Sequence, residues 1–99
     1  MSQSILVIAE HDNSELKSAT LNTLSAALQI KGLTGHSITL LVAGHNCASV
    51  AQQAATAEGV DNVIFADNNI LANQLAEEVA PIIINLHSAG VTFSHILSA

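Results

Sequence analysis

The sequence contains almost no aromatic residues and very few basic ones. It has two Phe, no Trp and no Tyr, and its two basic residues, Lys17 and Lys31, stand against eight acidic ones, so that the formal net charge is -6. Aromatic side chains supply the stacking surface for unpaired bases, and basic groups bind phosphate backbones. The composition therefore argues against nucleic acid and against an anionic membrane as partners.

Sequence signals for export or membrane insertion are missing as well. No apolar run approaches the roughly 18 residues of a spanning helix. Neither a signal sequence nor an Arg-rich presequence precedes the first apolar segment. The single cysteine, Cys47, excludes an internal disulfide. We expect a protein of a reducing compartment, either the bacterial cytoplasm or, for a processed eukaryotic chain, the mitochondrial matrix.

Four apolar segments, separated by stretches with helical spacing, dominate the 99 residues, which correspond to a single domain. They span residues 5–9, 38–43, 63–66 and 94–99. Segments that are apolar throughout are typical of parallel strands covered by helices on both faces. Because crossover connections are right-handed, the predicted strand order is 3-2-1-4, which puts the fourth strand at an edge.

An open apolar edge strand is usually covered by other parts of a protein. We therefore interpret the sequence as a domain cut short after its fourth strand. Self-association is expected, either through that edge or through a patch that fits a partner protein.

The first helix is predicted from about Glu15 to Ile30. It follows the capping side chains of residues 12–14 and ends before Gly32 and Gly35, which tolerate the turn into the next strand. Its buried face is expected to comprise Leu16, Thr20, Leu24, Ala27 and Leu28.

Two further helical stretches follow. The second helix covers about residues 47–58, is rich in Ala and stops at Gly59. The third contains Pro81, which predicts either a kink or two short helices with Pro81 in the first turn of the second one. It ends at residues 88–90, and its apolar side is formed by Leu71, Leu75, Val79, Ile82, Ile83 and Leu86.

Polar side chains follow each of the first three apolar segments. Because parallel strands end at the same edge of a sheet, these side chains should gather at one rim. This strand-end rim consists of Glu10, His11, Asp12, His45, Asn46, Cys47 and Asp67. Imidazole, thiolate and carboxylate groups are zinc ligands, yet the spacings match no zinc motif. A thiol nucleophile at Cys47 beside His45 lacks a third group that would orient the pair.

A nucleotide is the stronger candidate ligand for the strand-end rim, since helix amino termini at the strand ends bind phosphate. However, the residues after the first apolar segment are Glu10, His11 and Asp12 instead of a glycine loop. The sequence also contains neither a G-x-G-x-x-G nor a Walker motif. Acidic side chains at the rim would repel a pyrophosphate.

A simpler interpretation gives all these residues structural roles. His11 and His45 would then be exposed, and Cys47 would be a half-buried structural residue. The residues expected to cap helices or form turns are Asp12, Asn13, Asn46, Asn68 and Asn69. Outside the rim, the expected positions are a turn for His36, a helix end for His87, a strand start for His95 and a solvated helix face for Glu77 and Glu78.

Several short strings, in order and spacing, resemble the beginning of the electron transfer flavoprotein alpha subunit. Together they cover nearly the whole chain, at residues 5–13, 15–17, 19–22, 41–47, 59–61, 66–67, 75–77, 79–81 and 94–97. Two segments depart from the family pattern. The connection at residues 32–37 is longer, and the helix at residues 23–25 is less rich in Ala.

The resemblance implies a three-layer α/β sandwich with a parallel sheet, a Rossmann-like fold of the adenine nucleotide alpha hydrolase-like type. It also implies that residues 1–99 are part of the N-terminal domain. Further strands and a separate C-terminal FAD-binding domain would follow in the intact subunit. The FAD contacts belong to that later domain and the AMP site to the beta subunit, so no catalytic, cofactor or metal residue carries over to this chain.

The function implied by the resemblance is that of a non-catalytic scaffold. It would pack against the beta subunit in a heterodimer that accepts electrons from dehydrogenases and passes them to a quinone oxidoreductase. The alternative is a free-standing nucleotide-binding module that resembles the universal stress proteins and holds ATP at the strand-end rim. Those proteins place a glycine-rich phosphate loop after their fourth strand, where this sequence ends. A small thiol or metal enzyme lacks a convincing set of residues.

Overall fold

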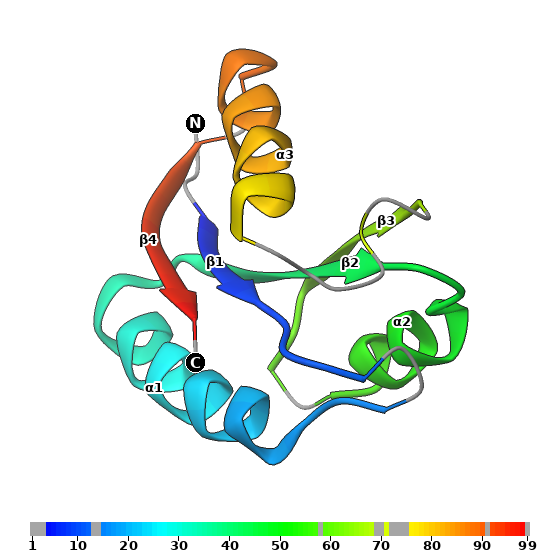
Figure 1. Ribbon diagram of the computed structural model, residues 1–99. Helices are drawn as coiled ribbons and strands as arrows, with labels where there is room; N and C mark the ends of the chain where they lie inside the picture. Colours follow the sequence, from blue (N-terminus) through cyan, green and yellow to red (C-terminus); the bar gives the residue numbers. More distant parts are fainter. Residues whose placement is uncertain are drawn as a thin grey trace.

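Strands and helices alternate along the chain. The computed structural model describes residues 4–12, 15–57, 59–68, 71, 76–90 and 92–98. The elements within these ranges, drawn in Figure 1, are β1 (Ser4–Ile8), α1 (Ser18–Thr34), β2 (Ser37–Gly44), α2 (Ala48–Ala55), β3 (Asn62–Asp67), α3 (Ala76–Ser88) and β4 (Phe93–Ser98).

The strands form one parallel sheet with the order β3-β2-β1-β4. In the centre of the sheet, Val7 of β1 lies between Leu40 of β2 and Leu97 of β4. The predicted fold class, strand order and edge position of the fourth strand are confirmed.

Helices cover both faces of the sheet, as Figure 1 shows for α1 and α2 on one side and α3 on the other. Alternate residues of each strand point to opposite faces. Ile5 and Val7 pack with the buried residues of α1 and α2, whereas Leu6 packs with Val79 of α3. The result is the expected three-layer sandwich.

The start of α1 differs from the prediction, because residues 15–17 lie ahead of the helix. The Asp12 carboxylate accepts a hydrogen bond from the Glu15 amide at 2.8 Å, and His11 and Leu16 form an isolated antiparallel bridge. The helix begins three residues later than expected, at Ser18, after Lys17, whose side chain makes no capping hydrogen bond.

The end of α1 was also predicted wrongly. Gly32 lies inside the helix, which continues to Thr34. Gly35 is the C-cap, with φ 75°, and its amide donates to the Lys31 carbonyl at 2.8 Å. A left-handed residue at this position is the usual glycine C-cap, so only the second of the two glycines acts as expected.

The buried face of α1 agrees with the prediction at three positions, Thr20, Leu24 and Ala27. Leu28 is 38% exposed and was wrongly assigned to the core. Its side chain lies over Gly59, at a position where a Cβ atom on that glycine would collide with it.

The Thr20 hydroxyl joins α1 to the end of β1. Its Oγ1 donates to the carbonyl of Glu10 at 2.8 Å and accepts from the amide of the same residue at 2.7 Å. Thr20 is fully buried, and its hydroxyl binds both backbone groups of Glu10, whose carbonyl also accepts from the Lys17 amide at 2.9 Å.

Of the other two helices, α2 departs from its predicted bounds, whereas α3 ends at Ser88 as predicted. α2 is shorter than residues 47–58, with its C-cap at Thr56, and it buries Val50 and Ala54. α3 runs through Pro81 without a break, so the alternative of two helices meeting at that residue is wrong. Predictions for Asn13, Asn69, Leu75 and for the side chains of Glu77 and Glu78 lie outside the described part of the chain.

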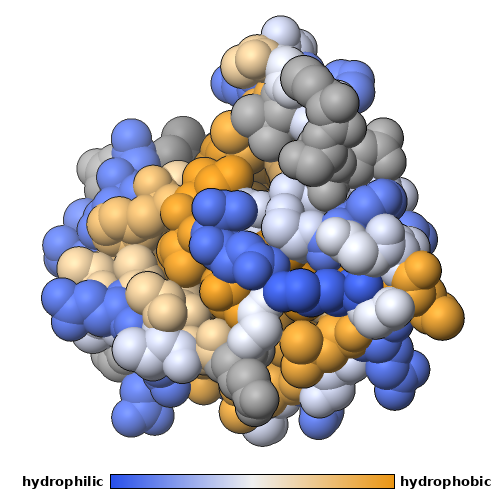
Figure 2. Space-filling view, turned by 180° about the vertical axis from the view of Figure 1, so that it is seen from behind, coloured by the Kyte–Doolittle hydropathy of each residue, from blue (hydrophilic) through white to orange (hydrophobic). Residues whose placement is uncertain are grey.

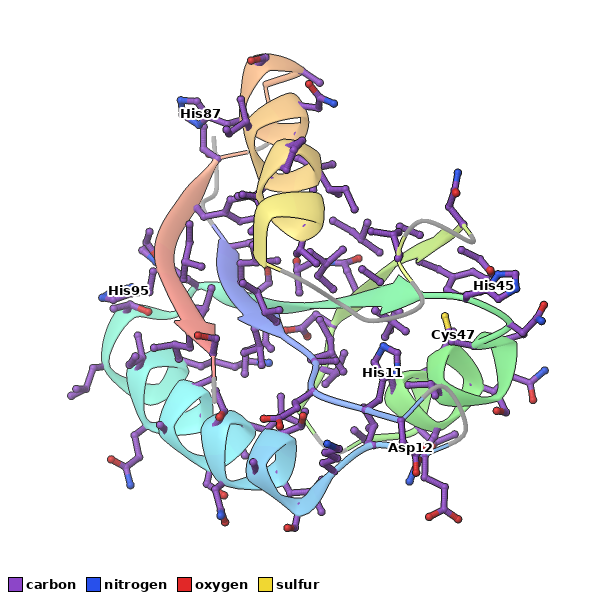
Figure 3. The ribbon with its side chains drawn as sticks, in the orientation of Figure 1. His11, Asp12, His45, Cys47, His87 and His95 are labelled. Atoms are coloured by element: carbon purple, nitrogen blue, oxygen red, sulfur yellow. The ribbon has the colours of Figure 1, made fainter. Side chains whose placement is uncertain are left out.

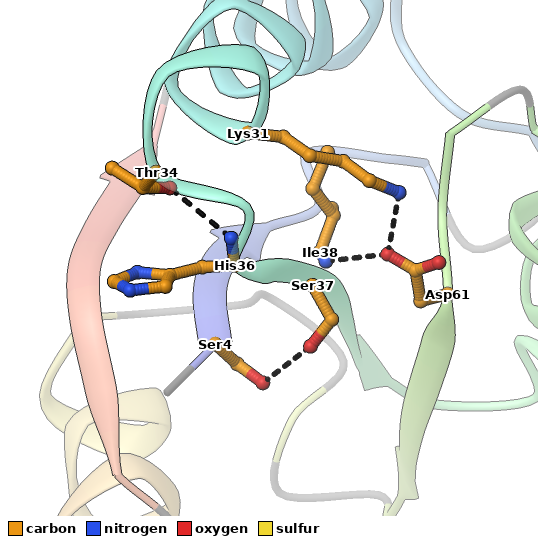
Figure 4. A network of polar contacts seen from close by, with 7 residues as sticks. All are labelled: Ser4, Lys31, Thr34, His36, Ser37, Ile38 and Asp61. Carbon is orange, nitrogen blue, oxygen red and sulfur yellow. Dashed lines mark hydrogen bonds and ion pairs between the residues drawn. The ribbon is translucent and has the colours of Figure 1, made fainter. Parts of the chain in front are cut away.

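A polar network holds the amino-terminal ends of β1 and β2 to α1 and to the start of β3 (Figure 4). The Asp61 carboxylate accepts from the Lys31 ammonium at 2.9 Å and from the Ile38 amide at 2.8 Å. Nearby, the hydroxyls of Ser4 and Ser37 are 3.1 Å apart. The hydrogen bond from Lys31, followed by that from the Ile38 amide, lowers the pKa of Asp61.

Part of the surface is apolar. Figure 2 shows hydrophobic areas on the rear face, crossed by a band of hydrophilic residues. The large apolar side chains exposed to solvent are Leu21, Leu28, Leu33, Phe65, Ile84 and Ile96. In the described ranges, no helix has the length and apolar character required to cross a membrane.

Truncating a side chain in the middle layer should strongly destabilise the fold. Leu40 is fully buried in β2, so we expect Leu40→Ala to lower the free energy of unfolding by about 2–5 kcal/mol, measured by urea denaturation. The control is Leu33→Ala at a leucine that is 89% exposed, where the change should stay within about 0.5 kcal/mol. Equal losses in both variants would contradict this assignment of the core.

The Asp61 contacts should make stability depend on pH. Because the pKa of Asp61 is lowered in the folded state, these contacts add to the free energy of unfolding at neutral pH. This stabilisation is lost as the pH falls below the ordinary value of 3.8 and through the lowered pKa. Asp61→Asn should cost about 0.5–1 kcal/mol at pH 7, since the carboxylate is partly exposed and screened. The difference from the parent protein should shrink in acid, as followed by urea denaturation across the pH range.

The matched control is Glu10→Gln. Glu10 pairs with Lys17 at 3.8 Å, and both side chains are exposed, so the free energy of unfolding at pH 7 should change by less than about 0.5 kcal/mol. An Asp61→Asn effect that persists unchanged at low pH would show that the carboxylate charge is not its cause.

Candidate functional site

The structure brings the residues of the strand-end rim to one end of the sheet. β1, β2 and β3 are neighbours and run parallel, and Gly44 at the end of β2 is paired with Asp67 at the end of β3. His11, Asp12, His45 and Cys47 accordingly lie toward the same side of the molecule in Figure 3. The rim is the place where a ligand would bind in an open parallel sheet.

His11 is buried, with 3% of its surface exposed, so its interpretation as an exposed rim residue was wrong. Its Nε2 atom lies 2.8 Å from the carbonyl oxygen of Ala43. A carbonyl only accepts hydrogen bonds, so Nε2 carries the proton and donates it. The imidazole therefore ties the segment after β1 to the end of β2, and this nitrogen is not available to a metal.

The Asp67 carboxylate shapes the turn after β2. Its Oδ1 accepts a hydrogen bond from the Asn46 amide at 2.9 Å and lies 3.8 Å from Nδ1 of His45. Asn46 has a left-handed backbone with φ 53°, a conformation that asparagine adopts more readily than most residues. This backbone geometry confirms the prediction that Asn46 forms a turn.

Carboxylates of the rim bind two backbone amides in the segments that precede α1 and α2. Asp67 holds the Asn46 amide, and Asp12 holds the Glu15 amide. The Leu16 amide donates to the side-chain oxygen of Gln53 at 2.9 Å. An anionic ligand at these positions would have to displace the protein's own acceptors and approach two carboxylates.

Cys47 is fully buried beneath the rim and is not the half-buried residue that was expected. It occupies the N-cap position of α2. Burial, followed by the nearby charge of Asp67, raises the pKa of its thiol and outweighs the hydrogen bond that lowers it. The thiol is protonated at neutral pH, so the geometry does not support a nucleophile at this position.

A metal site finds no support in the geometry of the rim. Among the described residues, no three His, Cys, Asp or Glu side chains lie close enough together to hold a metal ion. This agrees with the orientation of the His11 ring toward Ala43.

The three remaining histidines lie away from the strand-end rim. Nδ1 of His36 and Nδ1 of His95 are 2.8 and 3.0 Å from the Ser94 hydroxyl oxygen, where the connection after α1 meets β4. Sequence reasoning missed this cluster, because 58 positions separate His36 from Ser94. His87 lies in the last turn of α3, as predicted.

A shallow apolar pocket of about 250 Å³ lies between α3 and the carboxyl ends of β1 and β4. Its lining consists of Ile8, Val79, Ala80, Ile83 and Ser98. The volume is below the range of about 300–1,000 Å³ that is usual for small-molecule sites, and the lining contains no charged group. The pocket suits an apolar side chain better than a nucleotide.

The buried Cys47 should react slowly with a water-soluble thiol reagent. We expect modification of the folded protein at pH 8 to be more than about tenfold slower than in urea, because reaction requires an exposed thiolate. The control is Ala48→Cys in a Cys47→Ala background, since Ala48 is the exposed neighbour and its cysteine should react readily when folded. Comparable rates at both positions in the folded protein would contradict the burial of Cys47.

Sequence comparison identifies relatives along almost the entire chain. A family profile described as "Electron transfer flavoprotein domain" matches residues 5–99. The electron transfer flavoprotein subunit alpha of Pseudomonas aeruginosa is 52% identical over 94 residues, which are 95% of this chain and 28% of that protein. The mitochondrial alpha subunit of Dictyostelium discoideum is 46% identical over 84 residues, which are 85% of this chain and 23% of that protein.

A probable mitochondrial alpha subunit of Caenorhabditis elegans is 42% identical over 81 residues, which are 82% of this chain and 23% of that protein. The chain thus spans less than a third of the length of these relatives. The matched residues include the strands that the structure describes, apart from Ser4 at the start of β1, and the strand-end rim. The chain therefore belongs to the electron transfer flavoprotein family, with the alpha subunits as its relatives.

Proposed function

We propose that this chain is a scaffold domain of an electron transfer flavoprotein alpha subunit and a non-catalytic part of an electron carrier. Its role is to pack against the beta subunit and to support the flavin-binding domain, which belongs to the region of the alpha subunit that this chain does not cover. The observation that carries this proposal is the match of the family profile to residues 5–99.

The chemistry of the strand-end rim supports a role without a bound nucleotide. The pyrophosphate of FAD and the phosphate of AMP require amide or cationic donors. At the rim, the Asn46 and Glu15 amides are bonded to Asp67 and Asp12. A phosphate at these two amides would have to displace a carboxylate from each, and we assign FAD to the remainder of the alpha subunit and AMP to the beta subunit.

The intact flavoprotein would accept electrons from dehydrogenases through FAD and pass them to a quinone oxidoreductase. This chain would contribute the surface on which the two subunits meet, and no electron would reside on it. Its relatives include a bacterial protein and mitochondrial proteins, which supports the bacterial cytoplasm or the mitochondrial matrix as its compartment.

A nucleotide-binding module of the universal-stress-protein type is the second candidate. The strand order and the helices that begin at the carboxyl ends of β1 and β2 favour it, because this geometry recurs in nucleotide-binding sheets. The carboxylates that bind the rim amides count against it, since ATP would compete with them for the same donors.

The proposal predicts a protein complex that contains no flavin in the parts supplied by this chain. Mixed with the beta subunit and FAD, the chain should form a one-to-one complex by light scattering after gel filtration. The chain alone should elute colourless after incubation with FAD and should show no stoichiometric binding of AMP or ATP by calorimetry.

An intact alpha subunit in excess should displace the chain from the beta subunit, because both would occupy the same surface. Uptake of one equivalent of FAD by the isolated chain would overturn the assignment of the flavin site. Binding of one equivalent of ATP by the isolated chain would favour the second candidate. Lack of any complex with the beta subunit would contradict the scaffold role.

A further inference from the structure

Two histidines share one serine hydroxyl at the amino-terminal end of the sheet, which is the end opposite the strand-end rim. Nδ1 of His36 lies 2.8 Å and Nδ1 of His95 lies 3.0 Å from Oγ of Ser94. His36 directly precedes β2, whereas Ser94 and His95 belong to the start of β4. Side chains that are 58 positions apart in the sequence therefore meet at one oxygen atom.

An irregularity in β4 brings the side chains of Ser94 and His95 together. Neighbouring residues of a regular strand point to opposite faces of the sheet. In the pairing with β1, the partner of Ser4 is Phe93 and the partner of Ile5 is His95, so Ser94 is an extra residue in β4. An extra residue of this kind redirects side chains, and such irregularities are frequent beside functional sites.

The backbone of His36 is held by the end of α1. Gly35 is the left-handed C-cap of this helix, and the hydroxyl of Thr34 accepts a hydrogen bond from the His36 amide at 3.2 Å (Figure 4). The side chains of His36 and Ser94 are partly buried. The His36 imidazole is thus positioned in advance, which lowers the entropic cost of binding a ligand.

The hydrogen bonds around Ser94 contain a proton that a metal ion can replace. The hydroxyl has one proton and cannot donate it to both imidazoles. Its third neighbour, the Ser4 carbonyl oxygen at 3.5 Å, only accepts. At least one Nδ1 atom therefore donates a proton to Oγ.

The distances between these donor atoms are close to those in a coordination sphere. Ligand atoms at 2.0–2.1 Å from one ion lie about 3.0–3.4 Å from each other. The Nδ1 atoms of His36 and His95 are 2.8 and 3.0 Å from Ser94 Oγ, so a small movement of the rings would make room for an ion.

We propose that His36 and His95 bind a divalent transition-metal ion of the zinc type through their Nδ1 atoms. The Ser94 hydroxyl is a third and weaker ligand, water fills the remaining positions, and each ring then carries its proton on Nε2. Imidazole nitrogen is a preferred ligand of such ions, and the formal net charge of -6 favours a cation. The ion would join the connection after α1 to the start of β4. This inference is independent of the proposed function.

The first test is calorimetric titration of the 99-residue chain with Zn²⁺ at neutral pH, in which one equivalent should bind. His36→Gln and His95→Gln should each lower the affinity by at least about tenfold, since each removes one of the two imidazole ligands. The matched control is His87→Gln, because His87 is exposed at the end of α3 and should leave the affinity unchanged. His45→Gln, which removes an imidazole of the strand-end rim, should also have no effect.

Lack of saturable binding below about 1 mM Zn²⁺ overturns the proposal. Binding that either His36→Gln or His95→Gln leaves unchanged also overturns it, as does binding that His45→Gln or His87→Gln abolishes. Circular dichroism verifies that each variant is folded.

The second test identifies the ligand atoms by heteronuclear NMR of the imidazole nitrogens. Zn²⁺ should shift the Nδ1 resonances of His36 and His95 together, and the change should be complete at one equivalent. The resonances of His11 should stay unchanged, because its Nε2 atom is bonded to the Ala43 carbonyl. A shift in only one of the two rings, or coordination through Nε2, overturns the proposal.

Discussion

The burial of β1 on both faces is the constraint on which the rest of the structure depends. Ile5, Leu6 and Val7 are inaccessible to solvent, with Leu6 on the face of α3 and the other two on the face of α1 and α2. A strand with apolar residues at successive positions needs a covering layer on each side. Once β1 is central, the flanking strands, the crossover helices and the common rim at their ends follow.

The strands were predictable from the sequence because a strand that is buried on both faces has apolar residues at consecutive positions. Continuous apolar segments identified all of the strands that the structure describes, and the handedness of crossover connections gave their order. The helix ends were less predictable. Asp12 could cap a helix that begins near Glu15, but its carboxylate binds the Glu15 amide ahead of the helix, and α1 starts at Ser18.

Helical spacing alone also failed to separate buried from exposed leucines. Leu24 and Leu28 are one helical turn apart, yet only Leu24 is buried, because Leu28 reaches the edge of the layer above Gly59. The orientation of α1 on the sheet decides this, and the orientation depends on contacts distant in the sequence.

At the strand-end rim, too, the positions of the residues were predictable but their side-chain contacts were not. Topology predicts that His11, His45 and Asp67 come from neighbouring strand ends, since strand polarity and order suffice for that inference. Topology does not predict that the His11 ring turns inward to the Ala43 carbonyl, or that a carboxylate of β3 binds the turn after β2. Such contacts depend on side-chain rotamers and on pairs more than 20 positions apart. Because of these contacts, residues of types that are common in catalytic and metal sites instead hold the backbone in place at the rim.

This internal use of polar groups extends to the Thr20 hydroxyl, which serves both the amide and the carbonyl of Glu10. A valine of the same shape would take the Thr20 partner from the Glu10 amide, at a cost of about 1–3 kcal/mol, whereas the Glu10 carbonyl would keep its hydrogen bond from the Lys17 amide. These hydrogen bonds connect α1 to the segment after β1, where the chain leaves the sheet. The helix cannot lift from the sheet without unravelling that junction, so these two elements should open to hydrogen exchange as one cooperative unit.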